Sequence, residues 1–213
     1  MIDLVEIFCS IQGESTYAGL PTIFIRLAGC NLRCSYCDTT YSYEKKYALS
    51  PSNIVSQIKK YAPVNLVEIT GGEPLLQEKV YELFALLNGE SYIILLETNG
   101  SLSLEKVPEY VHKVVDVKCP GSKETESFLL SNLQYLKPGD EIKFVLTGLE
   151  DYSYAKRFIA KNDCAEYQIL FSPVRESLEP ALLAKWILHD KLPVRLQLQL
   201  HKYIWSNGSE ESV

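Results

Sequence analysis

The stretch TIFIRLAGCNLRCSYC, residues 22–37, joins a β-branched apolar run to three closely spaced cysteines. Residues 22–28 have the composition of a buried strand. Cys30, Cys34 and Cys37 follow in a C-x₃-C-x₂-C spacing. Three thiolates on one short loop can each bind one iron of a cubane cluster and leave the fourth iron without a protein ligand. The stretch therefore predicts a strand that ends at a [4Fe–4S] cluster site.

The remaining cysteines are Cys9, Cys119 and Cys164. A structural zinc site needs four ligands, and Cys9 could provide the fourth from a neighbouring strand, so zinc stays an alternative. Disulfides are a poor interpretation, because the opening MIDLVEIF carries acids where a secretory signal carries positive charge. We expect a cytoplasmic protein whose thiols stay reduced. Cys164 is interpreted as a packing residue.

A second polar motif lies one predicted crossover further along the chain. TGGEP, residues 70–74, directly follows the apolar run at residues 66–69. Paired glycines at a strand end let the backbone approach a ligand closely, and Glu73 could accept a hydrogen bond from a ligand ammonium. A Gly-Gly turn alone is more often only a turn. The position after a strand makes this one a candidate site.

Short apolar runs alternate with amphipathic stretches through the rest of the chain. The predicted strands are residues 22–28, 66–69, 92–96, 114–118, 141–146, 167–171 and 194–200, and the predicted helices are residues 50–62, 77–88, 124–136, 152–161 and 178–189. Alternation of this kind predicts right-handed crossovers and a parallel sheet. At roughly 30 residues per crossover about six or seven strands fit, too few for a closed eight-stranded barrel. The expected fold is α/β: an open, partial TIM-like barrel with reduced helices and its active site at the carboxyl ends of the strands.

The bulk composition suits one globular domain, which we place at residues 1–205, with a disordered acidic tail at residues 206–213. The chain has 213 residues, of which 46% are apolar and 23% charged, and its net charge is −6. It has no basic surplus to neutralise nucleic-acid phosphates. It also has no apolar stretch near the roughly 20 residues that cross a bilayer. These numbers argue against a nucleic-acid-wrapping or membrane protein and leave small-molecule chemistry open.

The cysteine run, with Tyr36 in the aromatic slot, and the GGEP motif together resemble the radical S-adenosylmethionine (SAM) superfamily. Further motifs narrow the resemblance: SIQGE at 10–14, RLAGCNL at 26–32, CDT at 37–39, ETNG at 97–100, DVKCP at 116–120 and LHKY at 200–203. In this order they look like the 7-carboxy-7-deazaguanine synthase family. The resemblance covers nearly the whole chain, whereas the cysteine run alone indicates only the superfamily.

The resemblance implies a lyase with the radical SAM core. In this family SAM chelates the open iron, and an electron from the cluster cleaves it to a 5′-deoxyadenosyl radical. The radical takes hydrogen from C6 of 6-carboxy-5,6,7,8-tetrahydropterin, and ring contraction with loss of ammonia gives 7-carboxy-7-deazaguanine for queuosine and related deazapurines. The resemblance also implies Mg²⁺, a homodimer and a flavodoxin- or ferredoxin-type reductant.

The resemblance assigns site residues as well. It implies substrate contacts for Ile11, Gln12, Gly13, Glu14, Arg26, Thr70 and His201, SAM contacts for Tyr36, Asp38, Gly72, Glu73, Lys118, Cys119, Pro120, Ser172 and Pro173, cluster ligation by Cys30, Cys34 and Cys37, and Mg²⁺ ligation by Thr39. Physically, a guanidinium can bond a carboxylate bidentately, and oxygen is the ligand that Mg²⁺ prefers. The ordinary alternatives are a surface ion pair for Arg26, a turn cap for Thr39 and a solvated strand end for Lys118.

Several points stay open at this stage. Ser15 replaces the glycine usual after Gln-Gly-Glu, and FSP at 171–173 stands where many members have Gln-Pro. His201 is expected inside an alternating strand, and His112 and His189 on the surface. A glycyl-radical-activating enzyme is an alternative, but the Gln-Gly-Glu and His-Lys-Tyr motifs would then have no role. A non-enzymatic iron–sulfur carrier is another, although a carrier needs no polar residues at the strand ends.

Overall fold

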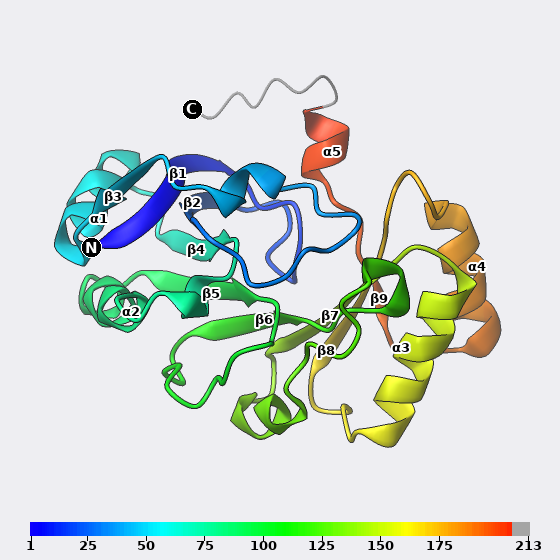
Figure 1. The fold of residues 1–213 in the computed structure, drawn as a ribbon. Coiled ribbons are helices and arrows are strands. Elements are labelled where there is room, and N and C mark those ends of the chain that lie inside the picture. Colours follow the sequence, from blue (N-terminus) through cyan, green and yellow to red (C-terminus); the bar gives the residue numbers. More distant parts are fainter. Residues whose placement is uncertain (206–213) are drawn as a thin grey trace.

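A curved, mostly parallel sheet organises the chain (Figure 1). The computed structural model describes residues 1–205, so the predicted tail lies outside the described residues. Within them the sheet has nine strands: β1 (Ile2–Ile11), β2 (Pro21–Leu27), β3 (Tyr47–Leu49), β4 (Leu66–Gly71), β5 (Ile93–Thr98), β6 (His112–Asp116), β7 (Glu141–Leu146), β8 (Gln168–Pro173) and β9 (Arg195–Leu196). Their order is β3-β1-β2-β4-β5-β6-β7-β8-β9. β1 runs antiparallel to β2 and β3, and the pairs from β2 to β9 are parallel. Since β3 and β9 end the sheet without pairing to each other, the predicted open barrel is confirmed.

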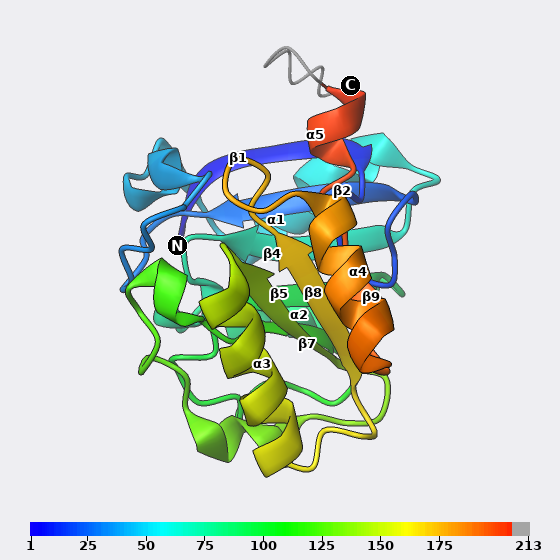
Figure 2. The ribbon, with the colours of Figure 1, turned by 90° about the vertical axis from the view of Figure 1, so that its right-hand side faces the viewer.

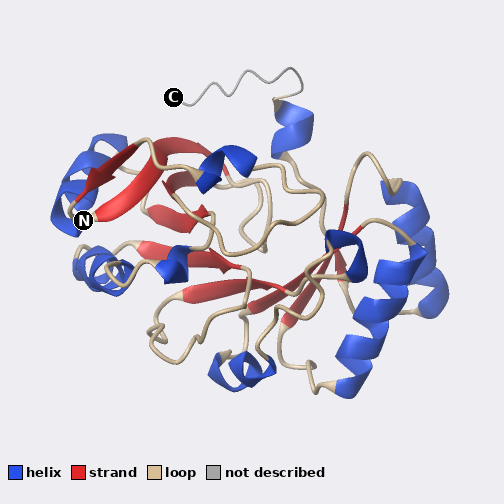
Figure 3. Cartoon of the chain, in the orientation of Figure 1, coloured by secondary structure: helices blue, strands red, loops and turns tan. Residues whose placement is uncertain are grey.

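The longer helices lie on the outer side of this curve, and loops cross its inner side (Figures 1 and 3). They are α1 (Pro51–Ile58), α2 (Val80–Gly89), α3 (Leu149–Lys161) and α4 (Pro180–Asp190), followed by the short α5 (His201–Ile204). Short 3₁₀ helices form η1 (Thr40–Tyr43), η2 (Lys59–Tyr61), η3 (Pro74–Leu76), η4 (Pro120–Ser122) and η5 (Leu130–Tyr135). Fully buried side chains such as Ile54, Phe84, Phe144 and Phe171 fill the layer between sheet and helices. Figure 2 shows α3 and α4 side by side over the β7–β9 end.

Local chemistry explains where the helices begin. The hydroxyl of Ser50 accepts a hydrogen bond from Asn53 N at 3.2 Å, and Pro51 opens α1, as predicted. α2 begins three residues later than predicted, at Val80. Gln77 lies before it because its side chain bonds to Asp3 N at 2.7 Å and to Ala28 O at 3.0 Å. Gln77 thereby ties the start of α2 to β1 and to the end of β2.

Two predicted elements were wrong. The helix expected at 124–136 is only the 3₁₀ turn η5, because the buried Asn132 side chain bonds to the backbone of residues 100, 102 and 104. The strand expected at 194–200 shortens to β9, and residues 201–204 form α5. His201 therefore begins a helix rather than extending a strand. β1 and β3 lie outside the predicted series of strands.

No helix within residues 1–205 has the length and apolar character needed to cross a membrane.

Candidate active site

A cavity of about 780 Å³ lies on the inner side of the sheet, and its lining runs from the carboxyl ends of the parallel strands to the loop that follows β1. Its size suits a small-molecule site. It brings together most of the residues that the sequence singled out: Ile11, Gln12, Gly13, Glu14, Arg26, Cys30, Cys34, Tyr36, Cys37, Asp38, Thr39, Thr70, Gly72, Lys118 and His201. These come from both ends of the chain and from four parts between them, so only the fold makes them neighbours.

Five residues assigned to SAM do not line this cavity: Glu73, Cys119, Pro120, Ser172 and Pro173. The Glu73 carboxylate is fully buried and accepts hydrogen bonds from Leu75 N, Thr98 Oγ1 and Asn99 N at 2.8–3.1 Å. It holds the turn after β4 against the turn after β5. The side chains of Cys119 and Ser172 are almost completely buried. If Glu73, Cys119 or Ser172 contacts a ligand, it must do so through its backbone atoms or after a local rearrangement.

The three cysteines suit a cluster by position and by chemistry. All three line the cavity as free thiols, on the loop that leaves β2. Cys30 Sγ accepts a hydrogen bond from Leu32 N at 3.4 Å and lies 3.9 Å from Asn99 Nδ2. N–H groups directed at a cysteine sulfur are a usual feature of iron–sulfur sites. Burial raises the pKa of the Cys30 and Cys34 thiols, and a coordinated metal would deprotonate them outright.

Cys9 cannot join them in the zinc arrangement considered above. Its neighbours Phe8 and Ser10 line the cavity, and successive side chains of a strand point to opposite faces. Cys9 therefore faces away from the three cysteines. Within the described residues, no three His, Cys, Asp or Glu side chains are arranged to hold a single metal ion.

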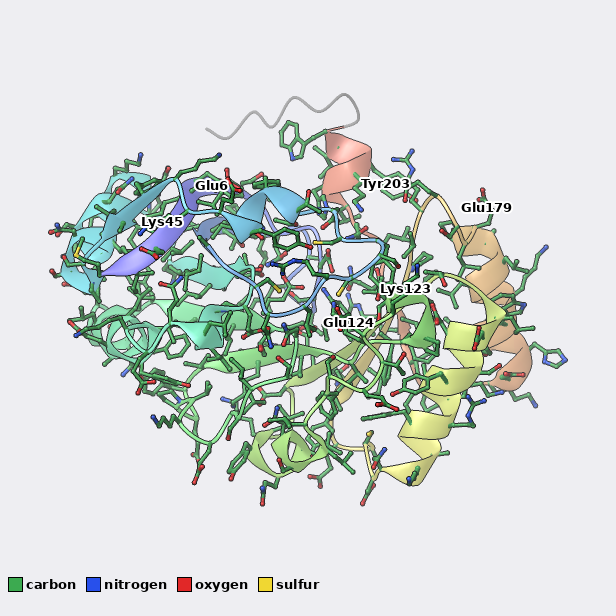
Figure 4. The ribbon with its side chains drawn as sticks, viewed as in Figure 1. Glu6, Lys45, Lys123, Glu124, Glu179 and Tyr203 are labelled. Carbon is green, nitrogen blue, oxygen red and sulfur yellow. The ribbon has the colours of Figure 1, made fainter. Side chains whose placement is uncertain are left out.

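The cysteine loop is fixed from both sides. Gly72 packs so tightly that a Cβ there would lie 1.9 Å from the carbonyl oxygen of Gly29. That oxygen accepts a hydrogen bond from Glu73 N at 2.8 Å. On the outer side, Glu124 (labelled in Figure 4) accepts a hydrogen bond from Arg33 N at 2.7 Å. The backbone of the loop is therefore held both by the turn after β4 and by the Glu124 side chain.

Beyond the cysteines, β6 presents an ion pair to the cavity. Lys118 Nζ lies 2.8 Å from Asp116 Oδ2. Burial lowers the pKa of Lys118, but the Asp116 carboxylate and the Cys34 thiolate outweigh this and raise it overall. The other oxygen, Asp116 Oδ1, is buried and accepts no hydrogen bond from the described residues. A ligand that carries donors, as SAM does, would satisfy it.

Acidic side chains surround one buried lysine deeper in the cavity. Lys143 Nζ lies 2.9 Å from Glu14 Oε2 and contacts Glu97 directly. Glu97 in turn accepts a hydrogen bond from Thr70 Oγ1 at 3.0 Å. Burial lowers the pKa of Lys143, but the charges of Glu14 and Glu97 raise it well above its ordinary value. Lys143 therefore stays charged and organises two carboxylates.

Glu68, on β4, is the most unusual acid of the site. It is 5% exposed, lines the cavity and accepts a hydrogen bond from the Gln12 side-chain amide. Burial, together with the charge of Glu97, raises the pKa of Glu68 to about 8. Glu68 is therefore largely protonated at neutral pH and can both donate and accept a hydrogen bond.

Arg26 is neither fully exposed nor a simple surface ion pair. Its Nε lies 2.7 Å from Glu6 Oε1, and its guanidinium carbon lies 5.7 Å from the ring centres of Phe8 and Tyr41 (Glu6 is labelled in Figure 4). Its side chain is 15% exposed. Glu6 holds the guanidinium through Nε, the position that leaves the two terminal nitrogens in line for a planar anion.

Thr39 does not cap the turn that it begins. No side-chain capping bond is present at the start of η1, and the Thr39 hydroxyl donates instead to Asp38 Oδ1 at 2.9 Å. Asp38 Oδ2 lies 2.9 Å from Lys202 Nζ on α5. Burial opposes ionisation of Asp38, but Lys202 and Thr39 outweigh it and lower its pKa to about 2. An acceptor lone pair of the Thr39 hydroxyl remains for a cation.

Sequence reasoning missed Glu68, Glu97, Asp116, Lys143 and Gln199, which also line the cavity. A usable signal was present. Glu68, Asp116 and Lys143 are charged residues inside predicted parallel strands, which are normally apolar on both faces. The prediction that His112 lies on the surface was wrong: its ring is largely buried and lies 2.8 Å from Glu141. His189 is exposed, as predicted.

Comparison with known proteins shows the family of this chain. A family model described as the Radical SAM superfamily matches residues 24–120. The crystal structure of QueE from Escherichia coli shares the fold, with a TM-score of 0.79 over 93% of each chain at 24% identity. The open sheet and the cysteine loop thus define a radical SAM enzyme, a class whose cofactors are a [4Fe–4S] cluster and SAM.

Two relatives narrow the class. The chain is 43% identical to the 7-carboxy-7-deazaguanine synthase of Koribacter versatilis, with 96% of this chain and 97% of the relative aligned. It is 45% identical to the protein of that name from Chlorobaculum tepidum, with 96% and 94% aligned. The chain belongs to the 7-carboxy-7-deazaguanine synthase family.

Proposed function

We propose that this chain converts 6-carboxy-5,6,7,8-tetrahydropterin to 7-carboxy-7-deazaguanine with loss of ammonia. The carrying observation is that one cavity joins the cysteine loop to Gln12, Arg26, Thr70 and His201. A carrier of electrons would need no such cavity beside its cluster. The relatives that bear the synthase name cover nearly the whole chain, which supports the same activity here.

In this proposal Cys30, Cys34 and Cys37 hold the cluster, and Gly72 and Lys118 lie where SAM would bind. The chemistry that cluster and SAM supply when bound is one-electron cleavage of SAM to a radical that takes hydrogen from the substrate. The protein's part is to hold the substrate in register with that chemistry, since a displacement of about 1 Å can cost 10²-fold in rate. Gly72 contributes by fixing the loop that carries Cys30, against which it packs directly.

The substrate's two ends match two parts of the cavity. Arg26 suits the carboxylate, because it is buried, charged and held by Glu6. The acidic group around Lys143, with Glu14, Glu68 and Glu97, suits the nitrogen-rich edge of the pterin, whose N–H groups need acceptors. Thr70 lies between the two parts, because it pairs with Arg26 in the sheet and bonds to Glu97.

Mg²⁺ bound by the Thr39 hydroxyl is the finer part of the proposal. Mg²⁺ usually takes few protein ligands and completes its shell with substrate and water. Thr39 lines the cavity two residues beyond Cys37 and makes no capping bond, and the ionised Asp38 beside it favours a cation. The flavodoxin- or ferredoxin-type reductant and the homodimer are likewise carried over from the family resemblance, and the cytoplasmic location is proposed from the acidic opening of the sequence.

The test is anaerobic incubation of the reconstituted protein with SAM, a reductant and the carboxypterin, followed by product analysis. We expect 7-carboxy-7-deazaguanine and ammonia in equal amounts. SAM cleavage without any product from the pterin, but with radical formation on a protein substrate, would point to the glycyl-radical-activating alternative. Absence of SAM cleavage by the reduced, cluster-loaded protein would point to the carrier.

A further inference from the structure

We infer that His112 and Glu141 are positioning residues that hold the substrate loop, residues 12–20, through Thr16. The inference rests on the proposed function only in taking the cavity-facing residues of this loop as substrate contacts. Its structural part is the clamp at Thr16, by which we mean the contacts of Thr16 with Glu141 and of Glu141 with His112. The clamp can be tested without any substrate.

The loop connects β1 to β2 and reaches across the sheet. Ile11 pairs with Pro21, the first residue of β2, so the loop leaves the sheet at the edge where the parallel strands begin. His112 and Glu141 are the first residues of β6 and β7, at the same edge. In Figure 1 the dark-blue loop extends from β1 and β2 toward the middle of the curved sheet. It therefore spans the strands between β2 and β6.

Thr16 is the point where the loop is fastened on the far side. Its N–H lies 3.0 and 3.2 Å from the two carboxylate oxygens of Glu141, and its hydroxyl donates to Oε1 at 2.6 Å. The Glu141 side chain is fully buried. Hydrogen bonds to a buried carboxylate are among the stronger ones in proteins. One loop residue thus makes both of its polar contacts to a single carboxylate.

His112 fixes the orientation of that carboxylate. Its Nε2 lies 2.8 Å from Glu141 Oε1, and its ring meets Tyr17 of the loop edge-on at 5.2 Å. Histidine and carboxylate together therefore contact two consecutive loop residues, Thr16 and Tyr17. Neither side chain lines the cavity, so both act on the site through the loop.

The start of β7 has a second anchor beside Glu141, the carboxylate of Asp140, and His112 Nδ1 also lies 3.8 Å from Asp140 Oδ1. The adjacent Asp140 carboxylate bonds to Lys113 N, Lys113 Nζ and Lys137 N at 3.0–3.1 Å, and the β6–β7 ladder continues beside it. Among residues 1–205, the Glu141 carboxylate takes its hydrogen bonds from Thr16 and His112. The Glu141 carboxylate is thus hydrogen-bonded to the loop through Thr16.

The loop needs fastening because of its backbone conformation. Ser15 has φ of 64°, a left-handed conformation that residues other than glycine adopt at a cost. It lies between Glu14, which binds Lys143 and Gln199 in the cavity, and Thr16, which binds Glu141. Release of Thr16 would let Ser15 relax and would leave Glu14 held only from the cavity side, by Lys143 and Gln199.

The test compares Thr16→Val, His112→Asn and Glu141→Gln with Thr16→Ser, which keeps the hydroxyl, and with His189→Asn, which removes an exposed histidine. Hydrogen exchange of residues 12–20 in the substrate-free protein is the first readout. We expect faster exchange confined to this segment in the first three variants, and wild-type exchange in Thr16→Ser and His189→Asn. Thr16→Val and His112→Asn are mild enough to fold if Glu141→Gln does not.

Steady-state kinetics is the second readout. We expect KM for the carboxypterin to rise about tenfold, as for loss of one hydrogen bond to a charged group, while KM for SAM stays unchanged. Two outcomes would overturn the inference, because they would show that the contacts of His112 and Glu141 with Thr16 only stabilise the fold. These are equal rises in KM for pterin and SAM, and faster exchange spread over the whole chain with a lower melting temperature. Wild-type exchange and KM in all three variants would also overturn it. A wild-type protein that does not use the pterin would refute the proposed function and leave the exchange test of the clamp intact.

Discussion

Replacing Gly72 by Ala tests how closely the turn after β4 must approach the cysteine loop. The new Cβ would lie 1.9 Å from Gly29 O, 2.4 Å from Gly29 C and 3.0 Å from Cys30 N, whereas ordinary contact begins at 3.4 Å. The colliding atoms are backbone, so the loop has to move by about 1.5 Å, which in overpacked sites costs roughly 1–3 kcal/mol. A shift of about 1 Å at the reacting centre costs about 10²-fold in rate. We therefore expect a lower iron and sulfide content and a turnover reduced about 100-fold.

Gly89→Ala is the matched control. Gly89 ends α2, has no atom within 4 Å of its added Cβ and has an ordinary φ. Alanine is favoured over glycine in a helix by about 1 kcal/mol, so this variant should melt at the same temperature as the wild type or slightly higher. Anaerobic iron and sulfide analysis, SAM cleavage and thermal melting are measured on both variants. Wild-type cluster content and turnover in Gly72→Ala would refute the argument that this approach positions the loop.

We make four further predictions, each for a different residue of the cavity. Cys34→Ala should lose the cluster iron, whereas Cys164→Ala, buried outside the cavity, should keep it; equal iron in the two would remove Cys34 from the ligand set. Arg26→Ala should raise KM for the carboxypterin by about 10- to 100-fold and spare SAM binding, as for loss of a charge-assisted bond; an equal loss of both would mean that Arg26 acts on folding. Thr39→Ala should blunt activation by Mg²⁺ without changing iron content, and full wild-type turnover after chelation would exclude the metal. Glu68, with its pKa raised to about 8, binds its proton more tightly in the folded state, so this contribution to stability is complete below its ordinary pKa and is lost as pH rises to about 8. Glu68→Gln should therefore flatten the fall in melting temperature between about pH 5 and pH 8, and parallel curves for the two proteins would contradict the assignment.

The sequence was sufficient for the parts of the fold that depend on local patterns. β7 has the predicted bounds, and Ser50 and Pro51 begin α1 as expected, because alternation and capping are properties of neighbouring residues. The segment 124–136 failed for the opposite reason. Its helical periodicity is overridden by Asn132, whose amide is needed by the backbone of residues 100–104, far away in sequence.

The same division holds for the site. The cysteine loop could be predicted because its three cysteines lie within eight residues of one another. The pairing of Lys143 with Glu14 and Glu97 could not, since it joins β7 to the loop after β1 and to β5. Charged residues inside apolar strands marked Glu68 and Lys143 as unusual, but only the sheet order shows that they face one cavity.

The open side of the sheet is where the loop after β1 meets the end of the described chain. β9 has two residues and does not meet β3, so the wall of the barrel is incomplete between them. The segments that pack against each other there are the substrate loop and the residues around α5: Leu200 N bonds to Gly13 O at 2.9 Å, and Gln199 bonds to Glu14 at 2.8 Å. Lys202 then ties α5 to Asp38 on the cysteine loop. Gly13 and Glu14, which the resemblance assigns to the substrate, are thus among the residues that pack together there, and a change that loosens this packing should alter pterin binding before it alters the cluster.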